Sequence, residues 1–372
     1  MSGERAVATV SQGAVERNSR LLTELLGEGS SLCAVVKADA YGHGADSAAA
    51  AALRGGAEWL AVATAAEAEA LRSSQPHTRI LVMGALDRDD LRRALAVAAD
   101  VGVWKPEFLA ACISFAEESG AVARVHVKHD SGMGRLGVRD PDAAISLLRA
   151  AEEGGHVELA GAWTHFATAD DPTDPFLAEQ LDAFAPVVEA AREANPGVTI
   201  HAANSGATLS EPASHFDMVR CGIAVYGLDP FGVDPEEHGL EPALELSSYV
   251  SDLKRFPKGA SAGYGRRWRA PTDTWVAVLP IGYGDGYVRA FGGQAEVLIG
   301  GRRYPVVGAV SMDNLTVDLG PETSVEAGER AVLIGRQGRE RVSAEELARI
   351  RGTINYEVVT SLTSRVDRRQ LD

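Results

Sequence analysis

The chain has 372 residues, of which 45% are hydrophobic and 24% charged, a composition typical of a soluble globular protein. Its formal net charge of -16 argues against a nucleic-acid partner, because a phosphate backbone requires a basic face. No run of about 18 apolar residues predicts a membrane span, and the N-terminal residues lack the apolar stretch that directs secretion. The three cysteines, Cys33, Cys112 and Cys221, are scattered without metal-ligand spacing, which suits a reducing cytoplasm.

The first two-thirds of the chain alternates short apolar runs with helical patterns. A helix is predicted over residues 14–27, where four leucines form one stripe. Eight strands are predicted, at Leu32–Lys37, Trp59–Ala63, Arg79–Met83, Asp100–Trp104, Ala123–Lys128, Val157–Trp163, Val198–His201 and Phe216–Arg220. Roughly eight βα units are what a (β/α)₈ barrel needs. A doubly wound open sheet is the alternative, but no GxGxxG fingerprint for dinucleotide binding follows the first strand.

The pattern changes after about residue 230. Residues 231–242 are rich in Pro, Gly and Glu and predict a linker. Beyond it, alternating residues and frequent turns predict strands at Leu244–Ser251, Thr274–Pro280, Ala295–Ile299, Arg303–Val310, Leu315–Leu319 and Ala331–Ile334. We therefore predict a barrel domain at residues 1–235 and a mostly β domain at residues 236–372, with the first few residues of the chain free to pack with the β domain.

Titratable and polar residues stand where the predicted barrel strands end. In a (β/α)₈ barrel the active site lies at the C-terminal ends of the strands. The residues at these ends are Lys37, Lys128, Asp130, Arg135, His165, His201, Asn204, Ser205 and Arg220. So many titratable groups on one rim are less easily explained as a solvated face, and the rim is the predicted site of chemistry.

A phosphate site is predicted after strands seven and eight, where barrels of this kind often bind phosphate. Asn204, Ser205 and Gly206 offer a hydroxyl, a glycine and a following helix N-terminus, which together suit an anion. Gly222 and Ile223 follow the eighth strand. Ordinary helix capping by Asn204 or Ser205 is the alternative interpretation.

Residues 35–44, VVKADAYGHG, resemble the N-terminal signature of bacterial alanine racemases. Other motifs of that family follow in the same order, as VKHDSGMGRLG at 127–137, AWTHFATAD at 162–170, FDMVRCGIAVYG at 216–227, AGYGR at 262–266, and further segments at 281–286, 310–313 and 352–357. The resemblance spans nearly the whole chain. The sequence departs from the family pattern at Gly206, Cys221 and Gly263, where relatives commonly have Ala, Pro and Ser.

The resemblance implies an enzyme that uses pyridoxal 5′-phosphate to interconvert L-alanine and D-alanine by two-base racemisation, supplying D-alanine for peptidoglycan. Lys37 and Tyr264 would be the catalytic pair. The implied cofactor-binding residues are Lys37, Tyr41, Arg135, His165, Asn204, Ser205, Arg220, Gly222, Ile223 and Tyr356. The implied substrate-binding residues are Arg135, Tyr283 and Met312, and Lys128 matches a lysine that is carbamylated in some relatives. The family also implies a cytoplasmic homodimer with shared active sites and no metal.

Arg220 carries a chemical argument once the resemblance places it at the pyridine nitrogen. A guanidinium keeps its proton, so it disfavours protonation of that nitrogen. Many pyridoxal enzymes instead place an acid there, which makes the ring a stronger electron sink. A weaker sink discourages side reactions such as transamination, as a dedicated racemase requires.

Three rival functions share parts of this pattern. A racemase of other or broader specificity would keep all the cofactor residues. A non-catalytic pyridoxal phosphate carrier would resemble the barrel half only, so the β domain with Tyr264 and Met312 argues against it. A decarboxylase of related architecture would place an acid at the pyridine nitrogen, so Arg220 argues against that function.

Overall fold

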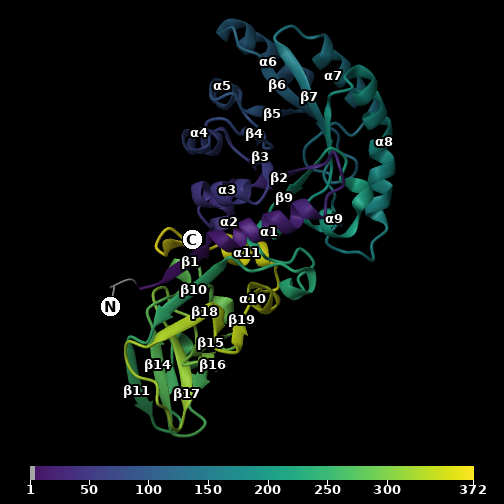
Figure 1. Ribbon diagram of the computed structural model, residues 1–372. Coiled ribbons are helices and arrows are strands. Elements are labelled where there is room, and N and C mark those ends of the chain that lie inside the picture. Colours follow the sequence, from purple (N-terminus) through teal and green to yellow (C-terminus); the bar gives the residue numbers. More distant parts are fainter. Residues whose placement is uncertain (1–4) are drawn as a thin grey trace. The chain divides into compact units, whose positions relative to one another are not determined.

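The computed structural model describes residues 5–372 and divides the chain into two compact units (Figure 1). The barrel unit contains residues 15–40 and 45–225, and the β unit contains residues 5–14, 41–44 and 226–372. No helix within residues 5–372 is long and apolar enough to cross a membrane. The domain boundary between residues 235 and 236 stays a prediction.

Eight parallel strands close into a ring in the barrel unit, which confirms the predicted (β/α)₈ barrel. In ring order they are β2 (Ser31–Val35), β3 (Ala57–Val62), β4 (Arg79–Val82), β5 (Asp100–Val103), β6 (Ala123–Lys128), β7 (Val157–Trp163), β8 (Thr199–His201) and β9 (Met218–Cys221). The ring closes where Leu32 of β2 pairs with Val219 of β9. Most strand residues are buried, as expected where a parallel sheet is covered on both faces.

Helices surround this ring (Figure 1). They are α3 (Ala45–Arg54), α4 (Ala65–Ser74), α5 (Arg88–Ala96), α6 (Pro106–Ser119), α7 (Pro141–Glu153) and α8 (Phe176–Ala194), with α1 (Gln12–Glu24) preceding β2 and the short α9 (Ser205–Ser210) following β8. Their starts follow local chemistry. Thr64 and Glu67 form a capping box on α4, Asp87 caps α5, and Pro106 occupies the first turn of α6.

A ten-stranded sheet dominates the β unit, in the order β11-β14-β17-β16-β15-β18-β10-β1-β20, with β19 paired to β18. Its strands are β1 (Val7–Ser11), β10 (Leu244–Tyr249), β11 (Asp252–Phe256), β14 (Thr274–Leu279), β15 (Glu296–Ile299), β16 (Arg302–Val307), β17 (Leu315–Gly320), β18 (Arg330–Gln337), β19 (Glu340–Val342) and β20 (Asp367–Leu371). A separate hairpin pairs β12 (Ser261–Ala262) with β13 (Trp268–Arg269). Helices α10 (Ala344–Arg351) and α11 (Asn355–Thr360) complete the unit.

Four strands of this sheet were not predicted, namely β1, β11, β19 and β20. Val7 of β1 pairs with Ser247 of β10 on one side and with Asp367 of β20 on the other. These partners are far apart in sequence, and no local pattern encodes such a pairing. The predicted strand at Arg303–Val310 also ends earlier, at Val307.

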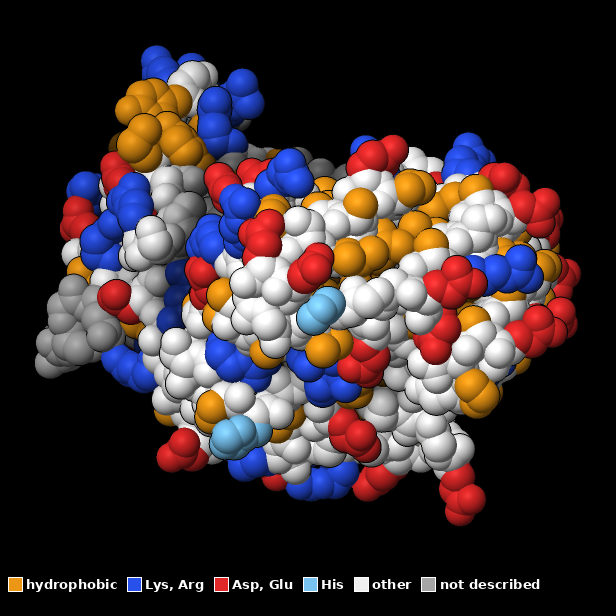
Figure 2. All heavy atoms as spheres, turned by 90° about the horizontal axis from the view of Figure 1, so that it is seen from above, with side chains coloured by type: hydrophobic (Ala, Val, Ile, Leu, Met, Phe, Trp, Pro, Cys, Tyr) orange, Lys and Arg blue, Asp and Glu red, His pale blue; other side chains and the backbone are white. Residues whose placement is uncertain are grey.

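The surface mixes charges of both signs. On the face seen in Figure 2, acidic and basic side chains are interspersed, and apolar groups lie between them. On this face the acidic side chains are therefore scattered rather than gathered in one patch.

The segment after the first barrel strand differs from the prediction. β2 ends at Val35, and Lys37 begins α2 (Lys37–Gly42), whereas the predicted strand extended to Lys37. Residues 38–41 have φ between +52° and +54°, so this turn is left-handed. A left-handed turn costs each residue other than glycine roughly 1–2 kcal/mol, because Cβ approaches the next carbonyl oxygen. Ala and Tyr give no sequence signal for such a conformation.

Hydrogen bonds from neighbouring segments hold the left-handed turn in place. The Glu67 carboxylate accepts from the Ala38 backbone N–H through Oε1 at 2.7 Å and from the Ala63 N–H through Oε2 at 2.9 Å. Asp39 Oδ1 accepts from the Ala45 N–H at 2.8 Å. Glu67 thereby ties the residue next to Lys37 to the end of the neighbouring strand β3.

Replacing Glu67 by Gln should destabilise the fold, because the amide NH₂ must face a backbone N–H at one of the two positions that accept now. We expect a loss of about 1–3 kcal/mol in the free energy of unfolding, measured by urea denaturation. Glu69→Gln on the same helix is the matched control. Glu69 pairs with Arg93 at the surface, so that change should have little effect. Equal losses in both variants would contradict this role of Glu67.

Candidate active site

Five of the predicted site residues gather at the C-terminal end of the barrel: Lys37, Lys128, Arg135, His165 and Arg220. Their proximity is visible in the electrostatics of His165. Burial lowers the pKa of this imidazole well below its ordinary value, and the charges of Arg220, Lys128, Arg135 and Lys37 lower it further. His165 is therefore neutral at pH 7. The surrounding cations make this end of the barrel suitable for an anionic ligand.

The two lysines of this cluster are electrostatically unusual. Burial, and then the charge of Arg135, lowers the pKa of Lys37. Burial, and then Arg220 and Arg135, lowers the pKa of Lys128 to about 7, and its Nζ lies 4.0 Å from the centroid of the Trp163 ring. Each amine is therefore more readily deprotonated than an ordinary lysine, which is what a nucleophile or a base requires.

Arg220 is buried in β9 and is held from several sides. Its Nη2 donates to the carbonyl oxygens of Thr164 at 2.8 Å and Ala202 at 2.9 Å. The same nitrogen lies 3.2 Å from His165 Nδ1, and Nη1 lies 2.9 Å from His201 Nδ1. Burial lowers the pKa of Arg220 to about 10, which still leaves the guanidinium charged at neutral pH.

Ser205 joins the loops that follow β8 and β9. Its buried Oγ accepts from the backbone N–H groups of Gly222 at 3.0 Å and Ala224 at 3.3 Å. Asn204 caps α9, with Oδ1 accepting from the Ala207 N–H at 3.0 Å. Because α9 has only six residues, a helix dipole contributes little at this position. Ile223 begins the next short turn, Ile223–Tyr226.

The glycine-rich loop after β6 presents Arg135 at the surface of the barrel unit. Asp130 Oδ1 accepts from the N–H groups of Gly132 at 3.2 Å and Gly134 at 2.9 Å, which folds the loop back on itself. At Gly137, a Cβ would meet the Asp130 backbone nitrogen at 2.7 Å, so only glycine fits the close approach. The folded loop thus fixes the backbone position of Arg135.

Gln180 is a positioning residue that the sequence analysis missed. It is fully buried in α8, where Nε2 donates to the His165 carbonyl oxygen at 3.1 Å and Oε1 accepts from the Ala167 N–H at 2.8 Å. A glutamine in an amphipathic helix looks like any polar surface residue, so its burial gave no sequence signal. Its contacts fix the backbone on both sides of Phe166 and so position His165.

In the β unit, three predicted residues are large and exposed. Tyr264 is 73% exposed, Met312 51% and Tyr283 40%. Tyr264 stands in a turn held by the β12–β13 hairpin, between Gly263 and Gly265, which both have positive φ. The segments that carry Tyr283 and Met312 lie side by side, since the Gly284 N–H donates to the Met312 carbonyl oxygen at 2.9 Å.

An ion network that the sequence analysis also missed supports these two segments. Asp285 is buried, and its carboxylate lies 3.2 Å from both Arg5 Nη2 and Arg365 Nε. Arg365 reaches on to Asp313 at 2.6 Å. The segments around Tyr283 and Met312 are therefore joined through side chains as well as through the backbone.

Tyr41 and Tyr356 belong to one aromatic cluster of the β unit. Their ring centroids lie 6.0 Å apart, and Tyr41 also lies 5.2 Å from Tyr226. His43 stacks on Tyr226 at 4.5 Å. The two tyrosines predicted to donate to phosphate are thus neighbours within this unit.

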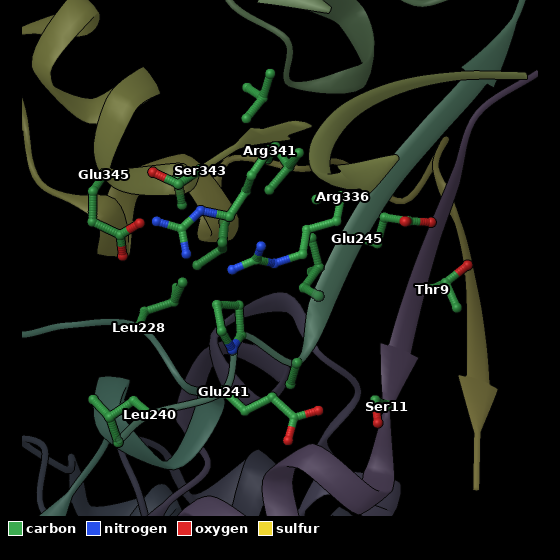
Figure 3. Close-up of a pocket in the computed structure, with 18 of the residues that line it drawn as sticks. Thr9, Ser11, Leu228, Leu240, Glu241, Glu245, Arg336, Arg341, Ser343 and Glu345 are labelled. Atoms are coloured by element: carbon green, nitrogen blue, oxygen red, sulfur yellow. The ribbon is translucent and has the colours of Figure 1, made fainter. Parts of the chain in front are cut away.

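A separate cavity of about 420 Å³ lies within the β unit (Figure 3). Arg336 and Arg341 point into it, but both already have carboxylate partners. Arg341 pairs with Asp234 at 2.5 Å, and Arg336 contacts Glu236. None of the predicted site residues lines this cavity, and we assign it no part in the chemistry.

Family models and full-length relatives match this chain over almost its whole length. The family model of the alanine racemase N-terminal domain matches residues 10–230, and that of the C-terminal domain matches residues 243–370. The alanine racemase of Frankia casuarinae is 39% identical, with 98% of this chain and 96% of that protein aligned. The alanine racemase of Mycobacterium avium is 41% identical, with 98% and 95% aligned.

Solved structures agree. The crystal structure of alanine racemase from D-cycloserine-producing Streptomyces lavendulae superimposes with a TM-score of 0.94 at 37% identity, covering 100% of this chain and 98% of that one. Alanine racemase from E. faecalis gives a TM-score of 0.93 at 32% identity, covering 100% and 99%. Since both family models match and full-length relatives share this identity, the chain belongs to the alanine racemase family.

Proposed function

We propose that this protein interconverts L-alanine and D-alanine with pyridoxal 5′-phosphate as cofactor and thereby supplies D-alanine for peptidoglycan. The observation that carries the proposal is the lowered pKa of Lys37, an amine placed at the barrel end among Arg135, His165 and Arg220 in a chain of this family. A carrier without catalytic function is disfavoured, because the C-terminal domain model also matches.

The donor set of the barrel unit fits the proposed cofactor. Lys37 would hold it covalently, and Ser205 with the backbone of Gly222 and Ile223 would bind its phosphate, with Asn204 shaping the loop. In the proposal, Tyr41 and Tyr356 add phenolic donors to the phosphate, and His165 packs on the ring. When bound, pyridoxal phosphate supplies an electron-withdrawing ring that makes the α-proton of an attached amino acid acidic.

The two bases of the proposal come from different units. Lys37 would move the proton of D-alanine on one face, and Tyr264 would move that of L-alanine on the other. Arg135 would pair with the substrate carboxylate through its planar fork, assisted by the backbone of Met312. Tyr283 would line the entrance. Arg220 would keep positive charge at the ring nitrogen and so limit side reactions.

We also propose a homodimer in which Tyr264 and Met312 of one subunit complete the site of the other. The exposure of Tyr264, Met312 and Tyr283 supports this assembly, because large side chains on a surface often mark contacts. The three cysteines are free and buried, which is compatible with action in the cytoplasm.

Mixing two inactive variants tests both bases and the shared site. Lys37→Ala and Tyr264→Phe should each slow alanine racemisation by on the order of 100-fold or more, as expected when a proton-transferring group is lost. If the sites are shared, random reassociation of the two proteins restores about one quarter of wild-type activity, because half of the dimers are mixed and each mixed dimer has one intact site.

Tyr304→Phe, on β16, is the control for removal of a tyrosine hydroxyl and should leave the rate unchanged. Racemisation at a normal rate by both single variants would overturn the assignment of the bases. Two inactive variants that regain nothing on mixing, although mixed dimers form, would place Lys37 and Tyr264 of one chain in the same site.

Lys128 is the proposed carbamylation site, since its pKa of about 7 leaves a large fraction of neutral amine at physiological pH. With ¹³C-bicarbonate at pH 8, we expect a carbamate carbon signal by NMR that Lys128→Gln abolishes and that Lys105→Gln, at the surface, retains. The signal should disappear as the pH falls below about 7, because the amine becomes protonated. A signal that persists in Lys128→Gln would contradict the proposal.

The same lysine makes folding depend on pH. Because its pKa is lower in the folded chain, the unfolded chain binds more protons between about 7 and the ordinary lysine value of 10.5, and this contribution to stability rises with pH in that window. In bicarbonate-free buffer, Lys128→Gln should therefore show a weaker rise, measured by urea denaturation.

A further inference from the structure

A continuous chain of hydrogen-bonded side chains runs through the core of the barrel unit and ends at Arg220. Arg220 Nη1 lies 2.9 Å from His201 Nδ1, and His201 Nε2 lies 2.9 Å from His126 Nδ1. His126 Nε2 then lies 3.0 Å from Asp100 Oδ2. His201, His126 and Asp100 are completely buried and come from three different strands, β8, β6 and β5.

Arg220 and Asp100, the two ends of this hydrogen-bonded series, fix which atom donates and which accepts in every bond between them. A guanidinium only donates, so His201 Nδ1 must accept and its single proton sits on Nε2. That proton is donated to His126 Nδ1, which leaves the His126 proton on Nε2, facing Asp100. An ionised carboxylate only accepts, so the last bond is satisfied in the same direction. Both histidines are thereby held as one tautomer.

Asp100 is anchored as an anion at the far end. Arg124 Nε lies 2.8 Å from Oδ1, and Arg79 pairs with Oδ2. Burial opposes ionisation of Asp100, but the hydrogen bonds from His126 and Arg79 outweigh it and lower its pKa. The carboxylate therefore stays ionised throughout the physiological range.

The surrounding packing is shaped for these rings. A Cβ on Gly161 would come within 2.0 Å of His126 Nδ1, so glycine makes the space that the imidazole occupies. Trp163 stacks on His201 with ring centroids 5.5 Å apart, and Trp59 meets His126 edge-on at 5.8 Å. Neither imidazole can turn away from its partners without repacking the core.

Arg220 forms no ion pair with a carboxylate among the described residues 5–372. Asp100 is the acid to which it is connected, through two imidazoles. We propose that Asp100 and His126 are positioning residues, which act through His201 to set the orientation of the Arg220 guanidinium toward the ring nitrogen of the cofactor. Only this last link rests on the proposed function, because the chain of bonds is a property of the protein alone.

The first test reads the tautomers directly. The full-length protein, labelled with ¹⁵N-histidine, is studied by NMR at pH 7 with and without pyridoxal phosphate. We expect His126 and His201 both to carry their proton on Nε2 and to have an unprotonated Nδ1 in either state. A proton on Nδ1 of either residue, alone or in a doubly protonated ring, would overturn the proposed direction. This measurement uses the wild-type protein, so its outcome does not depend on whether a variant folds.

The second test replaces Asp100 by Asn. Because both carboxylate oxygens of Asp100 accept hydrogen bonds, an amide NH₂ must face a donor whichever way it turns. If the NH₂ faces His126, it donates to His126 Nε2, so the proton of His126 moves to Nδ1 and that of His201 also moves to Nδ1. The His201 N–H then faces the N–H of Arg220. If the NH₂ faces Arg124, that guanidinium loses the oxygen that now accepts its hydrogen bond. In either orientation the negative charge at residue 100 is lost. Asp217→Asn is the control, since Asp217 also pairs with an arginine of the barrel, Arg192, and its carboxylate accepts from the Ile200 backbone N–H rather than from either histidine ring.

We expect Asp100→Asn, but not Asp217→Asn, to shift the ¹⁵N signals of His126 and His201 and the visible absorption of bound pyridoxal phosphate. The kcat for alanine should fall about tenfold or more with little change in KM, as expected for a misplaced active-site group. Identical spectra and rates in the two variants would overturn the positioning role. Failure of the wild-type chain to bind pyridoxal phosphate would instead overturn the proposed function and leave the ¹⁵N result standing.

Discussion

Arg220 carries a permanent positive charge that is buried at the C-terminal end of the barrel. This buried charge determines which groups must surround it and affects the pKa values of its neighbours. A buried guanidinium is tolerated only if its N–H groups are satisfied, and here carbonyl oxygens and imidazoles provide the acceptors. The thiols of Cys221, on the same strand, and of Cys33, on the neighbouring β2, cannot compensate the charge, because burial raises the pKa of Cys221 to about 12 and also raises the pKa of Cys33. Burial is the main cause of the lowered pKa values of Lys37, Lys128 and His165, and the charge of Arg220 lowers all three further.

The structure shows what surrounds the three positions at which this chain departs from the family pattern, Gly206, Gly263 and Cys221. At Gly206, a Cβ would lie 2.5 Å from the Ala169 carbonyl oxygen, so the alanine that is common in relatives would require the loop at Ala169 to move. Gly263 has φ +73°, and a Cβ there would meet the Ala309 backbone nitrogen at 2.9 Å. Cys221 is fully buried, with Sγ 3.3 Å from Thr208 Oγ1, at the position where the family pattern has a proline.

The sequence predicted the barrel well because each strand is a short apolar run with a helix after it, and both signals are local. It also predicted that Lys37, Lys128, His165 and Arg220 lie at the same end of the barrel, and the structure brings these four together although Lys37 begins α2 rather than ending a strand. It missed the left-handed turn after Val36, because that turn is held in part by Glu67, which is distant in sequence from the residues that adopt the conformation. The pairing of β1 with β20, the burial of Gln180 and the Asp285–Arg365 pair depend on partners distant in sequence, which periodicity cannot reveal.

The most direct measurement of the central claim is proton NMR of the protein with pyridoxal phosphate and L-alanine in D₂O, with D-alanine assayed in parallel. The α-proton signal should disappear while D-alanine accumulates, and D-alanine as starting material should give the same equilibrium mixture. Exchange without formation of D-alanine would show that one base works and the opposite one does not. An α-proton that persists although the cofactor is bound would contradict alanine racemisation by this protein.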